Sequence, residues 1–288
     1  MSHAYYLGLP IWQHPLWPGE FTAATSRGEQ ALADYATVFN TVEGNTTFYG
    51  LPRPATVQRW AANTPPGFRF CFKFPRVISH QQALAQCDRE TRNFLDTLAP
   101  LGERLGPLFL QLPPRFGPDG LDTLRGFLDR LPRGFRYAVE VRHRAFFAKG
   151  EAETALNRLL HERQMDRVIL DSRALFHIPT DDPDGLDARR RKPRLPVHAL
   201  ALTRHPLVRF IGHPQREANT PFLAPWLDKL GTWLDEGRQP FFFVHTPSNR
   251  DAPALARLFH QQLAARLALP PLPRWPAEQA QPAQLGLF

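Results

Sequence analysis

The sequence predicts an α/β fold, a TIM-type (β/α)8 barrel in a single domain, and two observations favour it. Short apolar runs rich in β-branched and aromatic residues recur eight times, and amphipathic stretches follow most of them. The alternation fills residues 5–267, which suits a TIM barrel of about 250 residues. A doubly wound sheet more often uses five or six strands, so we expect eight βα units.

The expected elements alternate in chain order. The strands are 5–9, 38–43, 69–74, 108–112, 137–141, 168–171, 207–211 and 241–245. The helices are 29–36, 55–62, 89–98, 121–131, 151–163, 222–234 and 253–267. The sixth unit is irregular, because a long polar connection between 171 and 207 replaces a clear helix. We interpret it as an elaborated loop and not as a domain boundary.

The composition changes after the barrel domain, which spans residues 1–267. Five prolines deny a continuous helix or an interior strand to residues 268–288, namely Pro270, Pro271, Pro273, Pro276 and Pro282. We therefore expect an extended proline-rich C-terminal tail. The tail ends in the apolar sequence QLGLF at 284–288, which makes it a candidate docking peptide.

Composition and charge narrow the function classes. Hydrophobic residues make up 43% of the chain and charged residues 22%, which excludes disordered, collagen-like and coiled-coil proteins. The net charge of +8 favours anionic partners such as nucleic acid, phosphorylated metabolites or a membrane surface. Cys71 and Cys87 lack metal-ligand spacing, and no apolar run is long enough to span a membrane. We therefore expect a cytoplasmic protein with free thiols and no membrane partner.

Strand alternation indicates which side chains face the barrel interior. In FRFCFKF, Phe70 and Phe72 share a face suited to helix packing, which turns Cys71 and Lys73 inward, with Lys73 near the mouth. Seven of the eight strands end in a polar or ionisable residue in this way. The candidate catalytic residues are Glu43, Lys73, Glu140, Asp171 and His245. Glutamates suit general acid and base chemistry, and cations stabilise developing negative charge.

Further residues at the strand ends are candidates for substrate binding. They are Trp12, Asn45, Tyr49, Gln111, Arg142, His143, Arg209, His213 and Asn249. Each candidate also has a structural alternative: the charged residues can form a buried ion-pair network, the histidines can be hydrogen-bonding scaffold and the aromatics can be packing. The basic run 189–192 is either a solvated loop or positive charge over the mouth.

Several long motifs resemble the YecE-like family, known as domain of unknown function 72. They are FNTVEGNTTFYGLP (39–52), WAANTPPGFRFCFKFPRVISH (60–80), LGPLFLQLPPRF (105–116), AVEVRH (138–143), VRFIGHP (208–214) and FFFVHTPSN (241–249). The resemblance covers residues 5–266 and implies a TIM-type barrel without an established reaction. Where many relatives have Gly-Thr-Ser-x-Trp, this chain has Gly-Leu-Pro-Ile-Trp at 8–12.

The terminal QLGLF is similar to the pentapeptide by which many bacterial replication and repair proteins dock on the DNA sliding clamp. Leu285, Leu287 and Phe288 supply apolar side chains for a cleft, and Gln284 can hydrogen-bond at its edge. The alternatives are a tail that folds back on its own barrel and a tail that is disordered.

Three functions remain open. The first is an enzyme, a hydrolase or phosphoesterase, that acts on a phosphate-containing or nucleic-acid substrate and is recruited to the sliding clamp. The second is a barrel enzyme on a small sugar or sugar phosphate, and the third is a non-catalytic ligand-binding adaptor. Carboxylates and histidines on several strands suit a divalent metal, but no HExxH spacing occurs, so the cofactor stays unassigned.

Overall fold

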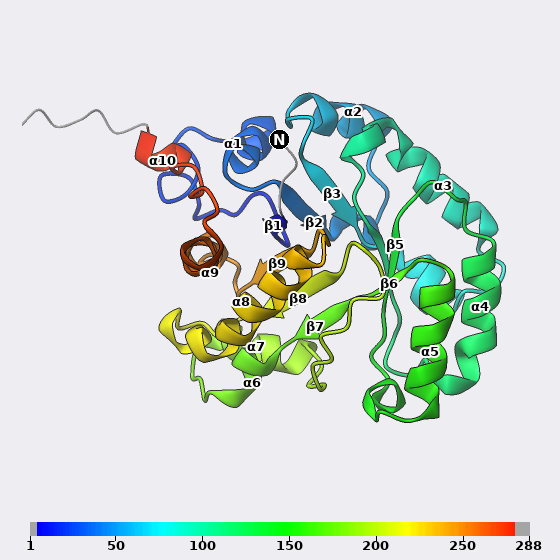
Figure 1. Ribbon diagram of the computed structural model, residues 1–288. Coiled ribbons are helices and arrows are strands. Elements are labelled where there is room, and N and C mark those ends of the chain that lie inside the picture. Colours follow the sequence, from blue (N-terminus) through cyan, green and yellow to red (C-terminus); the bar gives the residue numbers. More distant parts are fainter. Residues whose placement is uncertain (1–4, 280–288) are drawn as a thin grey trace, which may run out of the picture.

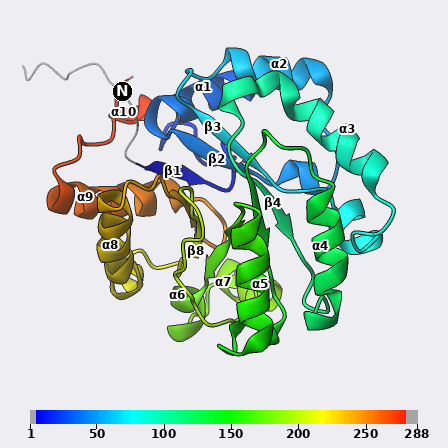
Figure 2. The same ribbon diagram turned by 45° about the vertical axis from the view of Figure 1, so that its right-hand side comes forward.

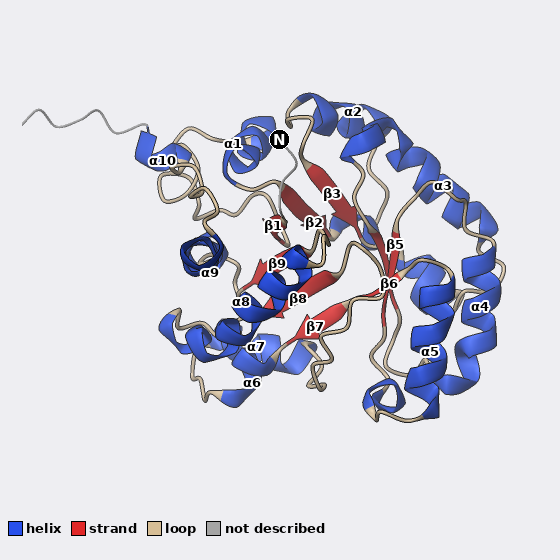
Figure 3. Cartoon of the chain, in the orientation of Figure 1, coloured by secondary structure: helices blue, strands red, loops and turns tan. Residues whose placement is uncertain are grey.

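The computed structural model describes residues 5–279, in which strands and helices alternate (Figure 1). The strands are β1 (Tyr6–Leu9), β2 (Thr41–Gly44), β3 (Arg69–Phe72), β4 (Leu108–Gln111), β5 (Tyr137–Glu140), β6 (Asp166–Arg167), β7 (Ile169–Asp171), β8 (Leu207–Ile211) and β9 (Phe241–His245). The helices are α1 (Gly28–Val38), α2 (Pro54–Ala62), α3 (Asp88–Leu98), α4 (Leu121–Asp129), α5 (Glu151–Glu162), α6 (Arg173–His177), α7 (Pro183–Arg191), α8 (Thr220–Asp235), α9 (Ala252–Leu267) and α10 (Pro276–Gln279). The strands lie at the centre with the helices around them (Figure 3).

The strands form two parallel sheets, one ordered β3-β2-β1-β9-β8-β7 and the other β4-β5-β6. Two isolated parallel bridges, Phe70 to Leu105 and Lys73 to Phe109, lie between β3 and the region of β4. Only Val168 separates β6 from β7, and its N–H donates to the Val139 carbonyl of β5 at 2.9 Å. Because the paired strands are parallel, their carboxyl ends gather on one side of the molecule.

Apolar side chains fill two regions on opposite faces of the strands. The larger region lies between strands and helices and includes Phe70, Phe72 and Phe74. A smaller cluster lies on the opposite face of the strands, formed by Tyr6, Cys71, Phe109, Ala138, Val168, Leu207, Phe241 and Phe243. The helices remain outside the strands when the molecule is turned (Figure 2). Polar side chains of the inner face therefore occur at the strand ends.

The sixth unit differs from the expected helix-free loop, because it contains α6 and α7. α7 begins after Asp182, whose carboxylate accepts the Gly185 N–H, and Pro183 occupies the first turn. This segment of the sequence has few apolar residues, so their helical repeat is too weak to predict a helix. Ala188 of α7 nevertheless packs with Leu170 and Ile211 at the ends of β7 and β8, which brings the unit over the strand ends.

Residues 268–275 form neither helix nor strand, and the segment contacts the rest of the chain as far as Gln279. The His260 Nε2–H donates to the Pro270 carbonyl (2.9 Å), and Trp275 packs against Phe21 with ring centroids 5.5 Å apart. α10 follows directly and lies beside α1 (Figure 1). The candidate docking residues Gln284, Leu285, Leu287 and Phe288 lie outside the described residues. Among residues 5–279, no helix has both the length and the apolar character to cross a membrane.

Candidate functional site

A buried ion network joins the carboxyl ends of three strands. Arg209 of β8 donates from Nε and Nη2 to the two carboxylate oxygens of Glu43 of β2, at 2.8 and 2.7 Å. Its Nη1 donates to Oε2 of Glu140, which ends β5, at 2.5 Å. All three side chains are buried. Arg209 therefore links the two sheets at the point where their strands end.

Neighbouring polar groups complete the network. Arg142 donates to Glu140 and to the side-chain oxygen of Gln111, both at 2.8 Å. Glu43 also accepts from the Asn45 side-chain amide (2.7 Å) and from Nε2 of His245 (3.2 Å). The carboxylates are thus fully hydrogen-bonded, which is what buried charges require.

The network fixes protonation states. Burial alone would raise the pKa of both carboxyls, but the Arg209 charge holds the pKa of Glu43 well below its usual range and, with Arg142 and Lys73, lowers that of Glu140 to about 2. Burial lowers the pKa of His245 to about 4, so its ring is neutral at pH 7. The carboxylates therefore stay ionised near neutral pH and hold no proton to donate.

A cavity of about 550 Å³ lies over this network. Its wall includes Lys73, Gln111, Arg142, Arg209 and His245 from the strand ends. The loops and short helical turns that follow the strands, together with the end of α7, contribute Asn45, Phe48, Tyr49, Arg76, His80, Arg191, Lys192, Thr246 and Asn249. A volume of this size is typical of small-molecule sites in proteins.

Three cations at the cavity have no carboxylate partner among the described residues: Lys73, Arg76 and Lys192. The Lys73 ammonium lies 3.5 Å from the centre of the Phe48 ring. Burial, reinforced by the Arg209 charge, lowers the pKa of Lys73 to about 7 and that of Lys192 to about 8. Arg142 and Arg209, which pair with Glu140 and Glu43, and Arg191, which pairs with Asp187, bring the cations of the cavity wall to six, and this excess of positive charge favours an anionic ligand.

The loop after β9 adds unsatisfied hydrogen-bonding groups to the cavity. Oγ1 of Thr246 and Oδ1 of Asn249 are buried without a partner, and both residues line the cavity. Asn249 also has a backbone φ of 63°, in the left-handed region. Unpartnered groups and a strained backbone are common at binding sites, because a ligand can complete the missing bonds.

The structure brings ten predicted site residues together in or directly beneath this cavity. They are Glu43, Asn45, Tyr49, Lys73, Gln111, Glu140, Arg142, Arg209, His245 and Asn249. Within the basic run, Arg191 and Lys192 line the cavity, whereas Arg189 donates to backbone carbonyls of the α6 region.

Four candidates lie elsewhere, which corrects their assignment to the site. Asp171 accepts from Nε1 of Trp226 and from Arg173, both at 2.8 Å, because it shares the outward face of β7 with Ile169. Trp12 packs against Trp60 in the outer layer.

The remaining two corrections concern histidines in turns. Nδ1 of His143 accepts the Ala145 N–H at 3.2 Å and caps a short helical turn. His213 is buried, where its Nδ1 accepts the Gln215 N–H (3.1 Å) and its Nε2 lies 3.3 Å from the Pro179 carbonyl oxygen. Both rings serve local backbone structure outside the cavity.

The sequence reasoning missed Arg76, His80 and Thr246. Arg76 directly precedes a π-helical turn, Val77–Gln81, that follows β3, and His80 lies within this turn. Such turns occur often at functional sites, but they have no periodic sequence pattern by which to find them. Thr246 directly follows the predicted His245, so its position next to a strand end was a usable signal.

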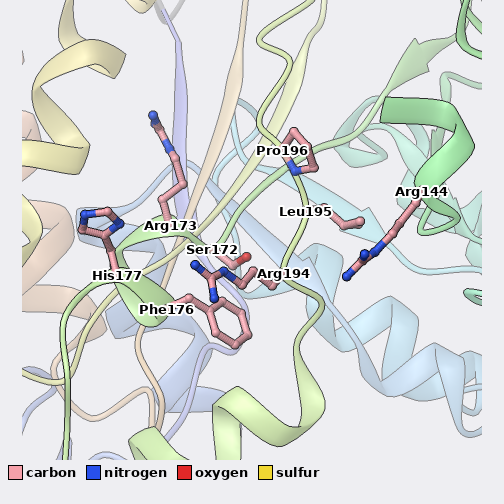
Figure 4. Close-up of a pocket in the computed structure, with 8 residues that line it drawn as sticks. All are labelled: Arg144, Ser172, Arg173, Phe176, His177, Arg194, Leu195 and Pro196. Carbon is pink, nitrogen blue, oxygen red and sulfur yellow. The ribbon is translucent and has the colours of Figure 1, made fainter. Parts of the chain in front are cut away.

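Figure 4 shows a second cavity, of about 450 Å³. It is lined by Arg144, Ser172, Arg173, Phe176, His177, Arg194, Leu195 and Pro196. Figure 4 shows Arg144 on one side and Arg173 with His177 on the other. Residues 192–194 separate the two cavities, since Lys192 lines the first and Arg194 the second.

The donor groups do not fit a divalent metal. Among residues 5–279, no three histidine, cysteine, aspartate or glutamate side chains are grouped as metal ligands. The Arg209 guanidinium lies between Glu43 and Glu140, where it already uses their oxygens.

The fold and the site define an α/β protein with parallel sheets and a cationic cavity at the carboxyl ends of the strands. The family model "Protein of unknown function DUF72" matches residues 6–280, and the chain belongs to this family. It is similar to the UPF0759 protein YecE of Escherichia coli K12 and of E. coli O157:H7, each 46% identical over 283 residues that cover 98% of this chain and 99% of the relative. The resemblance to the YecE-like family is thereby confirmed.

Solved structures support the same fold. A DUF72 family protein of Enterococcus faecalis V583 aligns with a TM-score of 0.67 and 20% identity, over 92% of this chain and 96% of the other. A DUF72 family protein of Thermotoga maritima MSB8 aligns with a TM-score of 0.67 and 21% identity, over 91% and 99%. At these identities the similarity extends to the fold alone.

Proposed function

We propose that the protein is a (β/α)8-barrel enzyme whose cavity binds a small phosphate-containing substrate. The barrel is supported by the interruption at Val168, since β6 and β7 then count as one strand and the total becomes eight. The bridges from Phe70 and Lys73 toward β4 support closure between the two sheets.

One observation carries the substrate class: Lys73, Arg76 and Lys192 line a cavity of about 550 Å³ and lack anionic partners among the described residues. A phosphate group supplies negative charge and several acceptor oxygens, and guanidinium and ammonium groups bind it through charge-assisted hydrogen bonds. The cavity size favours a metabolite over a nucleic-acid strand, which needs a groove several nucleotides long.

The chemical roles divide between two layers. Glu43, to which His245 donates, and Glu140 hold Arg209 in the cavity wall, where Arg209 and Arg142 stabilise negative charge on the substrate. Lys73 is the group suited to proton transfer, because its pKa of about 7 lies near the working pH. This assigns to Lys73 the acid and base work first expected of the glutamates.

Calorimetric titration with ribose 5-phosphate and with ribose tests the proposal. We expect binding of the phosphorylated sugar alone, and Lys192→Gln should weaken it about tenfold through loss of a charged hydrogen bond. Arg194→Gln is the matched control, because Arg194 lies two residues away and lines the second cavity. Equal binding of ribose, or a larger effect of Arg194→Gln, contradicts the proposal.

We also propose that the C-terminal QLGLF docks the protein on the bacterial sliding clamp, which the sequence of residues 284–288 supports. Immobilised clamp should retain the full chain and should lose it when residues 284–288 are deleted. Retention of the shortened chain refutes this docking site.

A further inference from the structure

Lysine is scarce in this chain, and half of its lysines lie at the cavity. The four lysines among 35 Lys and Arg residues are Lys73, Lys149, Lys192 and Lys229. Arginine stays protonated in proteins, whereas a lysine amine can lose its proton and attack an electrophile. A lysine at the carboxyl ends of the strands can therefore act as a neutral nucleophile, which the abundant arginines cannot do.

The backbone around Lys73 is held on both sides. Its N–H donates to the Gly44 carbonyl at 3.3 Å, and its own carbonyl accepts from the Thr47 hydroxyl at 2.6 Å. The ammonium at the other end of the side chain lines the cavity and makes no hydrogen bond or ion pair within the described residues. Lys73 thus has a fixed backbone and an amine without a hydrogen-bond partner among the described residues.

We propose that Lys73 is a nucleophile that forms a Schiff base with a small phosphorylated aldehyde or ketone. This deepens the proposed function and rests on it, because the neighbouring cations hold the phosphate. The neutral amine adds to the carbonyl carbon to give a carbinolamine. The carbinolamine loses the former carbonyl oxygen as water, and a C=N bond to Nζ remains.

The surroundings favour each stage of this reaction. Burial and the positive charges of Arg209 and Arg142 favour the neutral amine, and the pKa of about 7 leaves a large fraction deprotonated at neutral pH. The protonated imine carries positive charge, which the substrate phosphate offsets. The Phe48 ring, 3.5 Å from Nζ, also stabilises a cation at this position.

Reductive trapping with sodium borohydride tests the proposal on the full chain. Borohydride delivers hydride to the imine carbon and a solvent proton goes to nitrogen, so the adduct gains the mass of the carbonyl compound plus two hydrogens minus one water. With glyceraldehyde 3-phosphate we expect a single adduct on Lys73 by peptide mapping, and little adduct with unphosphorylated glyceraldehyde.

Two matched variants sharpen the result. Lys73→Arg keeps the charge but cannot form an imine, so it should lose the adduct while it retains ribose 5-phosphate binding by calorimetry. Lys149→Arg makes the same exchange at an exposed lysine outside the cavity and should keep the adduct. Circular dichroism of both variants checks that they fold.

Other outcomes overturn the proposal in distinguishable ways. Binding of ribose 5-phosphate without an adduct at Lys73 refutes the Schiff base and leaves the proposed function standing. Failure of the unaltered chain to bind ribose 5-phosphate refutes both proposals. An adduct on Lys192, or equal labelling of all four lysines, refutes the assignment to Lys73. Trapping only with an oligonucleotide that carries an abasic site refutes the small-molecule substrate.

Discussion

The charged side chains at the strand ends differ in whether they have a partner of opposite charge. Glu43 and Glu140 are satisfied by Arg209 and its neighbours, whereas Lys73 has no such partner among the described residues. A buried ion pair contributes little net stability when intact, but removal of one partner leaves a buried charge uncompensated. The ion network therefore holds the Arg209 guanidinium in place, and the amine of Lys73 supplies the reactivity.

The first prediction concerns Glu140. Glu140→Gln keeps the shape of the side chain but leaves Arg209 and Arg142 without one of their counter-charges, which should lower the free energy of unfolding by about 3–5 kcal/mol. Urea denaturation measures this. Glu29→Gln, which breaks the exposed pair with Arg59, is the control and should cost about 0–1 kcal/mol. Equal losses in the two variants would show that the buried network is not coupled.

The second prediction concerns acid. The pKa of Glu140 is about 2 when folded, below its ordinary value of 4.5, so the unfolded chain binds the proton more readily. The contribution of Glu140 to stability is full above pH 4.5 and is lost as the pH falls toward about 2. Stability measured across this window should fall more steeply in the parent than in Glu140→Gln. Parallel curves would contradict the assignment.

At the scale of elements, the alternation of inward and outward side chains along the strands predicted most of the cavity residues. The wrong assignment of Asp171 to the site came from not applying this alternation to β7. The inward positions of Cys71, Lys73 and Glu140 follow from a period of two. Val168 belongs to the inner cluster, so the same period places Asp171 on the outer face. The hydrophobic periodicity did not predict α7, because only a small apolar surface of this helix contacts the strand ends. Packing of Ala188 against Leu170 and Ile211 decides its position.

The third prediction concerns the segment that follows α9. Trp275 packs on Phe21 and under the guanidinium of Arg257, whose distance to the ring centre is 3.6 Å. Trp275→Ala should cost about 1–3 kcal/mol in thermal or urea unfolding, since the ring is only half-buried. Trp275→Phe should cost less, because the buried indole N–H has no partner to lose. Arg274→Ala, at an exposed neighbour, is the control; a similar loss there would argue against docking through Trp275.

At the scale of the whole molecule, the net charge of +8 predicts salt-sensitive binding. Attraction between an anion and exposed cations is screened over about 10 Å at 0.1 M salt. Affinity for ribose 5-phosphate should therefore fall as sodium chloride is raised, in calorimetric titrations at constant pH. An affinity unchanged by salt would indicate that charge does not carry recognition.

The whole fold was the easiest feature to predict, and the roles within the site were the hardest. Length and the repeated strand and helix pattern sufficed for a parallel α/β architecture. The sequence could not show that Arg209 lies between Glu43 and Glu140, because these residues come together only through the arrangement of the strands. Because the sequence does not reveal this contact, Glu43 and Glu140 were assigned as acid and base candidates.

The Arg209 network also bears on how the protein is made. Arg209 lies 166 positions from Glu43 and 69 from Glu140, and His245 lies 202 from Glu43. During synthesis both glutamates leave the ribosome well before their counter-ion, and contacts of such long range close late in folding. Until β8 joins the strands, Glu43 lacks its guanidinium partner and must remain hydrated, whereas Glu140 can already pair with Arg142, so it is Glu43 that opposes premature burial of the growing sheet. The site is therefore completed only after most of the chain has been synthesised.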